Sequence, residues 1–179
     1  QGTNSIMATD LALKLADYVV TEAGFGFDLG GEKFFDIVAR YGDLSPKVVV
    51  LVATVRALKY HAGVAREDLN TPNARLAVLG LATLRKHYEN IAKFGVECII
   101  ALNRFSSDTD EEIKAVVEAC ENEGMNIAAA DIFNLGGEGG LELAEKTVRL
   151  AESVKTAYRP LYDWKAPVED KIFSVASEI

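Results

Sequence analysis

The chain has 179 residues, of which 49% are hydrophobic and 26% are charged, and its formal net charge at pH 7 is −8. A chain of this length fits one domain with a substantial buried core. The negative charge argues against a surface that binds nucleic acid or an anionic membrane, because both require clustered positive charge. The two cysteines lack metal-ligand spacing, and no run is typical of a signal peptide or a membrane span. We therefore expect a cytoplasmic protein with reduced thiols.

The first distinctive segment is an apolar run followed by a glycine-rich turn. The run Asp17–Thr21 predicts a buried strand, and Gly31–Tyr41 predicts a helix. The connecting turn, Glu22–Gly31, holds four glycines, two acidic residues and two aromatic residues. Glycine lets a ligand approach the main chain closely, and a turn that opens a helix directs free N–H groups at an anion. For the glycines alone, a turn without a ligand explains the pattern equally well.

Further along the chain, short apolar runs alternate with helical patterns. The runs bounded by turn residues predict three more strands, at Val48–Ala53, Cys98–Leu102 and Ile127–Ile132. Helical patterns occur at Val55–His61, Asn73–Phe94, Thr109–Glu123 and Glu138–Ser153. Gly95 and Gly124 are typical helix-ending residues, and Pro167 indicates the start of one more helix. This order predicts an α/β fold, in which an open parallel sheet with right-handed crossovers has helices on both faces.

In such a sheet, ligands bind beyond the carboxyl ends of the strands. Four loops are expected at that edge, namely Glu22–Gly31, Thr54–Lys59, Asn103–Asp108 and Phe133–Gly140. The second loop presents Thr54, Arg56 and Lys59, which suit a phosphate or carboxylate group. Taken alone, an arginine after a strand is usually part of a surface salt bridge.

The third and fourth loops combine aromatic side chains with glycines. Phe105 and Phe133 each follow a strand end, where a flat heteroaromatic ring could stack against both. The N–H groups of the four glycines Gly136, Gly137, Gly139 and Gly140 could form an anion-binding nest before a helix. A single phenylalanine such as Phe105 is more often a core residue than a ligand platform. Four such loops at one edge favour a binding site.

Several longer runs are arranged as in a known enzyme family. They are TEAGFGFDLGGEKFF from Thr21, TVRALK from Thr54, LRKHYENIAKFGVECIIALNRFSSDTDEE from Leu84 and GGEGGLELAEKTV from Gly136. In order and spacing they resemble the formate–tetrahydrofolate ligase (formyltetrahydrofolate synthetase) family over essentially the whole chain. The resemblance implies a fold related to P-loop nucleoside triphosphatases and a homotetrameric assembly. It also implies a reaction of formate, ATP and tetrahydrofolate that yields 10-formyltetrahydrofolate through formyl phosphate.

The resemblance assigns roles to individual residues. Phe25 and Gly26 fall beside the formyl phosphate site. Phe105 and Phe133 fall on the aromatic pair that encloses the pterin ring of the folate. The family usually has Trp at the position of Phe133 and Pro at the position of Ser106. The smaller ring weakens stacking by ~0.5 kcal/mol but keeps its geometry.

The implied chemistry requires a closed, cationic pocket, because an acyl phosphate is otherwise lost to water. Arg56 and Lys59 would supply positive charge, and Asp108 would bind the pterin amino group unless it caps the following helix. Glu22 and Glu138 are weaker candidates for cation or hydroxyl contacts. The candidate residues are Phe25, Gly26 and Arg56 for catalysis, Thr54, Lys59, Phe105, Asp108 and Phe133 for substrate binding, and Gly24, Gly136, Gly137 and Gly139 for phosphate binding. No metal ligand is expected among them.

The family's Gly-Lys-Thr phosphate loop does not occur in these 179 residues. We therefore expect an internal part of the ligase that is inactive alone, with residues 1–158 as its α/β part and 159–179 leading to a further portion. The alternative is a non-catalytic module, or a split-gene subunit, that binds folate and acyl phosphate. The expected ligands are formate, ATP with Mg²⁺ and tetrahydrofolate, with a monovalent cation as a further candidate. The expected protein partners are copies of the same chain or a complementing chain.

Overall fold

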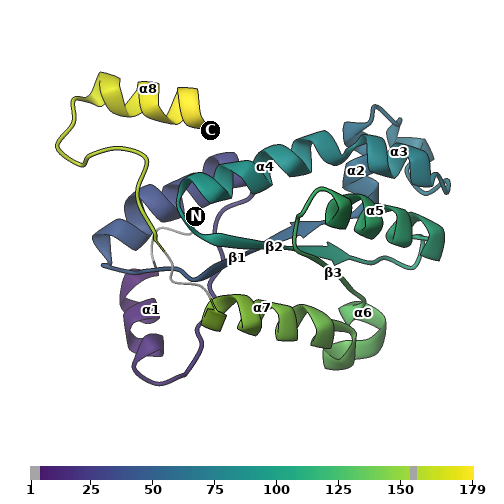
Figure 1. Ribbon diagram of the computed structural model, residues 1–179, viewed down its shortest axis with the longest axis horizontal. Helices are drawn as coiled ribbons and strands as arrows, with labels where there is room; N and C mark the ends of the chain where they lie inside the picture. The colour runs from purple at the N-terminus through teal and green to yellow at the C-terminus, as the bar shows by residue number, and fades with distance from the viewer. Residues whose placement is uncertain (1–4, 154–156) are drawn as a thin grey trace. The chain divides into compact units, whose positions relative to one another are not determined.

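The computed structural model describes residues 5–153 and 157–179 (Figure 1). The chain falls into two compact units. The first unit comprises residues 5–46, 90–96 and 157–179. The second unit comprises residues 47–89 and 97–153 and contains the β-sheet. Residues 159–179 thus share a unit with the amino-terminal segment.

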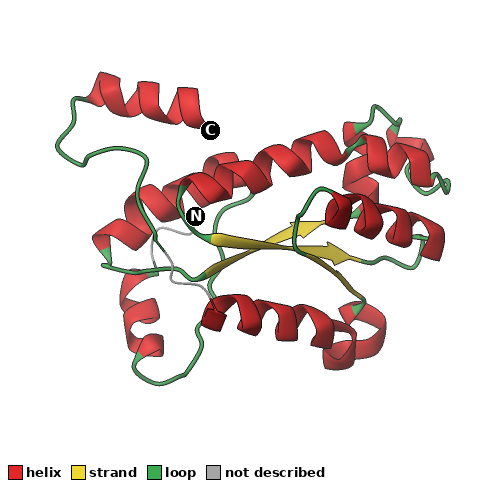
Figure 2. Cartoon of the chain, in the orientation of Figure 1, coloured by secondary structure: helices red, strands yellow, loops and turns green. Residues whose placement is uncertain are grey.

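The second unit is built on a three-stranded parallel sheet in the order β1-β2-β3 (Figure 2). The strands are β1 (Val48–Ala53), β2 (Glu97–Asn103) and β3 (Ile127–Ala130). Both neighbouring pairs are parallel, with Val48 opposite Glu97 and Ile100 opposite Ile127. The expected open parallel sheet is therefore confirmed, and β1 has the predicted bounds. The central strand β2 is buried along most of its length, as its continuous apolar sequence predicts.

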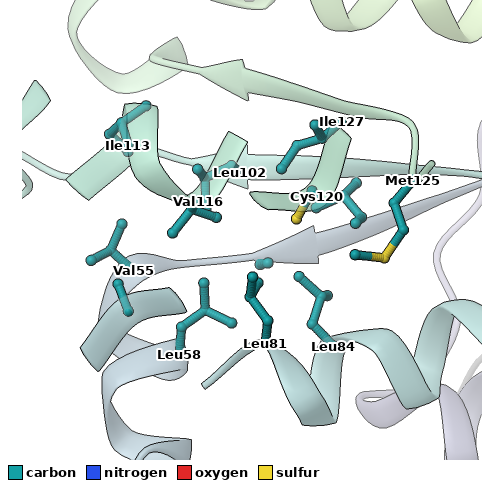
Figure 3. Close-up of a cluster of buried hydrophobic side chains, with 13 residues drawn as sticks. Val55, Leu58, Leu81, Leu84, Leu102, Ile113, Val116, Cys120, Met125 and Ile127 are labelled. Carbon is teal, nitrogen blue, oxygen red and sulfur yellow. The ribbon is translucent and has the colours of Figure 1, made fainter. Parts of the chain in front are cut away.

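Helices cover both faces of this sheet (Figure 1). Helix α7 (Leu141–Ser153) lies on one face, and α5 (Asp110–Asn122) and the first turns of α4 (Leu81–Lys93) lie on the other. Helices α2 (Val55–His61) and α3 (Ala74–Leu79) pack against α5 and complete that layer. Figure 3 shows the core between these helices and the sheet, formed by buried side chains that include Val55, Leu58, Leu81, Leu102, Val116 and Ile127.

Capping residues explain several helix ends. Thr109 caps α5 in a capping box with Glu112, so that each side chain bonds the other's backbone N–H. Gly95 and Gly124 have φ values of +70° and +75° after α4 and α5, as expected for helix-ending glycines. Both cysteines, Cys98 and Cys120, are free and buried, in agreement with the expected reduced thiols.

The predicted single helix Asn73–Phe94 is wrong, because α3 and α4 are separate helices that meet at Gly80. A Cβ atom at Gly80 would lie 1.9 Å from the carbonyl oxygen of Leu58 in α2. The backbone therefore passes α2 too closely for any side chain, and this tertiary contact coincides with the break. Only glycine fits at this position.

The predicted strand Ile127–Ile132 is also shorter than expected. Strand β3 ends at Ala130 and is followed by the short helix α6 (Ile132–Leu135) and a 3₁₀ helix, Gly136–Gly140. The predicted helix from Glu138 therefore begins as 3₁₀ turns and becomes α-helical at Leu141. A short 3₁₀ helix, Arg66–Asp68, also lies between α2 and α3.

The first unit contains α1 (Ile6–Leu13), a helical segment from Gly26 to Tyr41, and α8 (Val168–Glu178), which follows Pro167 as predicted. Much of the segment 26–41 is π-helical, at Gly26–Gly31 and Phe34–Ala39. The rings of Phe27, Phe35, Phe94 and Tyr158 pack together in this unit, with Phe35 and Phe94 stacked at 4.8 Å.

The predicted buried strand Asp17–Thr21 is wrong. These residues have irregular structure and do not join the three-stranded sheet. The side chain of Val20 is 93% exposed, so the segment is not part of an apolar core. An apolar run becomes a strand only where a second strand pairs with it, and the expected sheet of at least four strands has three among the described residues.

Candidate functional site

Three of the four predicted loops lie at one edge of the sheet. Because β1, β2 and β3 are parallel, the loops that follow them, 54–59, 103–108 and 131–140, begin at the same carboxyl edge. The Arg104 N–H donates to the Ala130 carbonyl at 2.9 Å, which joins the ends of β2 and β3. The fourth loop, Glu22–Gly31, belongs to the first unit, and its approach to this edge stays a prediction.

The loop after β1 leads directly into α2. The hydroxyl of Thr54 accepts a hydrogen bond from the Ala57 N–H at 3.1 Å, so this side chain caps the helix. Arg56 is exposed, and none of the ion pairs recorded among the described residues involves it. Its guanidinium group is therefore accessible to an anion at the carboxyl edge.

Lys59 differs from Arg56, because its side chain is buried and already bonded. The ammonium group lies 2.8 Å from Glu112 Oε1 and 3.1 Å from the Thr71 carbonyl oxygen. A substrate would have to compete with both oxygens and reach a side chain that is 2% exposed. Substrate binding by Lys59 stays a prediction, and the geometry favours Arg56 as the anion ligand.

The loop after β2 is a tight turn closed by Asp108. The Asp108 carboxylate accepts a hydrogen bond from the Phe105 N–H at 2.9 Å, and the Asp108 N–H donates to the Phe105 carbonyl at 3.0 Å. The cap of α5 is Thr109, so the alternative interpretation of Asp108 as the helix cap is wrong. Asp108 is buried, and its carboxylate holds the backbone of Phe105, whose ring is predicted to stack on the pterin.

The two predicted stacking residues are both exposed. Phe105 is 43% exposed after β2, and Phe133 is 91% exposed on α6 after β3. The alternative interpretation of these side chains as core residues is therefore wrong. Whether the two rings face a common gap stays a prediction.

The glycines before α7 have two different surroundings. A Cβ atom at Gly139 would lie 2.2 Å from the Asp131 carbonyl oxygen, and the Asp131 N–H donates to the Gly139 carbonyl at 3.0 Å. Gly139 is therefore required by the packing of the loop on itself. A Cβ atom at Gly136 or Gly137 would meet no atom within 4 Å, so there is open space beside both residues. The Gly136 N–H already donates to the Ile132 carbonyl. Gly136 has a φ of +60°, which favours glycine.

Within the first unit, the glycine-rich turn places one aromatic ring outward and one inward. Phe25 is 90% exposed before Gly26, which has a φ of +77°. Phe27 is buried against Phe35 and Phe94, with ring centroids 5.9 and 5.8 Å apart. Of the two rings, only that of Phe25 is accessible to a ligand.

Close packing also shapes the backbone of this turn. A Cβ atom at Gly30 would lie 2.0 Å from the Gly24 carbonyl oxygen, so the two glycines are in backbone contact. Gly30 is therefore required by this contact. A phosphate-binding role for Gly24 stays a prediction.

Two neighbouring carboxyl groups in the first unit, one buried and one partly buried, were not predicted from the sequence. Asp36 is fully buried and accepts a hydrogen bond from the Leu161 N–H at 2.8 Å. Glu32 lies one turn earlier, and burial together with the neighbouring Asp36 carboxyl raises the pKa of Glu32 to about 7. Burial also raises the pKa of Asp36. The signal in the sequence is the spacing of two acids by four residues in a stretch where Phe34, Phe35 and Ile37 are apolar.

A cavity also lies away from the predicted site, at the opposite edge of the sheet. It is lined by residues at the start of β3, including Asn126 and Ile127, and by Lys146 and Arg149 of α7. The Lys146 ammonium donates to the Ile127 carbonyl at 2.8 Å and pairs with Glu142 at 2.7 Å. These contacts within the chain already account for the Lys146 charge.

Within residues 5–153 and 157–179, no three histidine, cysteine or acidic side chains are grouped so that they could hold a metal ion. No helix in the same part of the chain is long and apolar enough to cross a membrane.

Comparison with known proteins agrees with the resemblance of the motifs. The family model described as formate–tetrahydrofolate ligase matches residues 1–179. A formate–tetrahydrofolate ligase of Syntrophus aciditrophicus (strain SB) is 75% identical over 179 residues, which are 100% of this chain and 32% of that protein. The chain thus spans about a third of the length of this relative. With a match that runs from the first residue to the last, the chain belongs to the formate–tetrahydrofolate ligase family.

Proposed function

We propose that these residues form part of an ATP-dependent ligase that joins formate to tetrahydrofolate through a formyl phosphate intermediate. The observation that carries the proposal is the pair of exposed rings, Phe105 and Phe133, beyond the carboxyl ends of neighbouring parallel strands. A pterin ring is flat and aromatic and gains stacking energy between two such side chains. The membership of the family supports this choice of ligand.

In this proposal the cationic and N–H groups of the edge hold the acyl phosphate. Arg56 is exposed at the start of α2 and supplies positive charge, next to the hydroxyl of Thr54. The open space at Gly137 lets the acyl phosphate approach the backbone there, whereas the Gly136 N–H already donates to the Ile132 carbonyl. Phe25 and Gly26 shield the formyl group from water, and Gly24 and Gly139 shape the two loops.

The folate nitrogen then attacks the formyl carbon and displaces phosphate. The rate of this step depends on the position of the pterin, because reacting atoms must be held about 3–3.5 Å apart. Asp108 contributes by holding the Phe105 backbone and is a candidate acceptor for the pterin amino group. ATP with Mg²⁺ phosphorylates formate, and a P-loop that binds its phosphates is not found in these 179 residues. A P-loop-related fold, a monovalent cation and a homotetrameric assembly complete the proposal.

A second candidate function is a module that binds folate and acyl phosphate without its own ATP site. Such a module would bind tetrahydrofolate and would depend on a complementing chain for the nucleotide chemistry.

The test replaces each ring in a complete ligase that carries these residues. We expect Phe105→Ala and Phe133→Ala each to weaken tetrahydrofolate binding by about 1–3 kcal/mol, by analogy with base–aromatic stacking, and to leave ATP binding unchanged. The matched control is Phe173→Ala, which removes an exposed phenylalanine from α8, outside the four loops. Folate titrations and thermal melts on the same preparations are the measurements. Unchanged folate affinity in both variants would contradict the proposal.

A further inference from the structure

Glu112, in the first turn of α5, has a carboxylate whose two oxygens are both fully engaged. Its side chain is 1% exposed. Oε1 accepts from the Lys59 ammonium at 2.8 Å and from the Asn73 N–H at 2.9 Å. Oε2 accepts from the Thr109 N–H and from the Thr109 hydroxyl, both at 3.0 Å. A buried charge is tolerated where donors of this kind surround it, and a capping box alone requires only the contacts to Thr109.

The donors come from three separate segments of the chain. Lys59 lies in the last turn of α2, and its ammonium group also donates to the Thr71 carbonyl at 3.1 Å. Asn73 caps α3 by accepting from the Leu76 N–H at 3.0 Å. The Glu112 carboxylate therefore joins α2 and the starts of α3 and α5. Burial raises its pKa, but the Lys59 ammonium and the backbone donors outweigh burial and lower the pKa to about 2.

The same contacts extend to Phe105, whose ring is predicted to stack on the folate. Asp108 directly precedes Thr109, and its carboxylate accepts a hydrogen bond from the Phe105 N–H at 2.9 Å. A continuous series of bonded groups thus runs from Lys59 through Glu112 and Thr109 to the turn that carries the Phe105 ring. Phe105 itself is 43% exposed, so the packing of its own ring holds it less firmly than a core side chain is held.

We propose that Glu112, paired with Lys59, is a positioning residue for the Phe105–Asp108 turn and thereby for the folate. The inference rests on the proposed function, because it assumes that Phe105 contacts the pterin. It assigns Lys59 a role different from substrate contact: Lys59 neutralises and orients the carboxylate behind the site. Loss of the pair would loosen the start of α5 and displace the ring, while the nucleotide chemistry elsewhere in the enzyme would be unaffected.

The test uses a complete ligase that carries these residues and compares Glu112→Gln with Val116→Ala. The glutamine side chain keeps the shape but has one acceptor oxygen, so donors are left unpaired and Lys59 loses its counter-charge. Val116 lies one turn further along α5, is fully buried and belongs to the core, so its truncation lowers stability without touching the turn. It is the matched control for a purely structural effect.

We expect Glu112→Gln to raise the KM for tetrahydrofolate about tenfold or more, because a misplacement of about 1 Å far from the chemistry can cost up to about 10²-fold. The KM for ATP should stay within about twofold, because a residue that acts on folate alone leaves the other substrate's binding unchanged. Val116→Ala should lower the melting temperature and leave both KM values unchanged.

A second pair of variants keeps the test decisive if Glu112→Gln does not fold. Thr109→Val removes one donor to Glu112 and keeps the Lys59–Glu112 pair, and Thr109→Ser restores the hydroxyl. We expect a severalfold higher KM for tetrahydrofolate with valine and recovery with serine, because only the serine hydroxyl can bond the carboxylate.

Two results would overturn the inference in distinguishable ways. If the Glu112 and Thr109 variants lower the melting temperature as Val116→Ala does but leave the folate KM unchanged, the positioning role is wrong. The proposed function still stands in that case if Phe105→Ala raises the folate KM in the same assay. If Phe105→Ala also leaves it unchanged, the proposed function fails and the inference fails with it.

Discussion

Arg56 and Lys59 lie three residues apart on α2 but differ in their exposure to solvent. Lys59 is buried with Val55 and Leu58, and Arg56 is exposed. Positions 55, 58 and 59 share one face of a helix, so the lysine falls within the apolar stripe. Its ammonium group therefore needs an internal acceptor, which Glu112 provides. A basic residue within an apolar stripe indicates a buried pair before it indicates a ligand contact.

Glu32 has a protonation state that changes close to neutral pH. Its carboxyl has a pKa raised from 4.5 to about 7, chiefly by burial and further by the neighbouring Asp36. Lys33 lowers this pKa, and Arg40 lowers that of Asp36, but burial outweighs both. The folded state thus binds the proton more tightly than the unfolded state. The associated stabilisation is fully present below pH 4.5 and is lost as the pH rises through 7.

We expect the 179-residue chain to lose about 1–2 kcal/mol of stability between pH 5 and pH 8 through this pair, after allowance for solvent screening. Glu32→Gln should remove most of this pH dependence, because an amide donates to Asp36 at any pH. Melts followed by the emission of Trp164, the one tryptophan of the chain, measure the effect. Trp164 lies beside Arg40, whose guanidinium is 5.2 Å from its ring, and therefore reports on this unit. An equally steep pH profile in Glu32→Gln would show that other groups cause it.

At the scale of elements, two glycines of one loop have different roles. Gly139 is required by packing, and Gly137 is a candidate for contact with a ligand. Gly139 contacts the Asp131 carbonyl so closely that a methyl group cannot be added without a shift of the backbone. Gly137, two residues earlier, has open space around it. The two positions therefore form a matched pair within the 3₁₀ helix Gly136–Gly140.

We expect Gly139→Ala to lower the free energy of unfolding by about 1–3 kcal/mol, the usual cost of overpacking. Gly137→Ala should change stability by less than about 0.5 kcal/mol, as at other open surface positions. If the backbone at residue 137 holds the acyl phosphate, Gly137→Ala should also weaken inhibition of a complete ligase by inorganic phosphate. Urea unfolding and phosphate titration measure the two effects. Equal loss of stability in both variants would refute the distinction.

At the scale of the whole molecule, the chain carries candidate folate and acyl-phosphate residues without a Gly-Lys-Thr loop. It spans 32% of the length of its relative. The P-loop lysine and backbone N–H groups bind nucleotide phosphates in proteins that carry this motif. We therefore expect the isolated 179-residue chain to release no ADP in the presence of ATP, formate and tetrahydrofolate. A coupled assay of ADP release is the measurement, with a complete ligase as the positive control. Robust turnover by the chain alone would contradict this view of the catalytic machinery.

Local signals allowed several elements to be predicted from the sequence. Val48–Ala53 became β1 and Val55–His61 became α2 with the expected bounds, because Thr54 caps the helix and the strand is a continuous apolar run. Gly95, Gly124 and Pro167 marked helix ends for reasons that depend only on backbone geometry. The placement of loops at the carboxyl edge then followed from the parallel pairing of strands.

Long-range contacts decided the rest. Asp17–Thr21 is irregular because, among the described residues, no strand pairs with it. The helix is interrupted at Gly80 because α2 passes close to it there. A local sequence pattern contains neither of these contacts.

The sequence by itself determined the family, the parallel α/β class and the three loops that follow the strands at one edge of the sheet. Only the tertiary structure decided what those residues contact. The sequence made Lys59 a candidate ligand, but in the structure its ammonium group lies 2.8 Å from Glu112 of α5. The sequence also made Asp108 a candidate helix cap, but the residue that caps α5 is Thr109. The physical reason is that helix and strand signals act over a few neighbouring residues. The partner of a buried charge is chosen by which elements pack together, here across 53 positions of the chain.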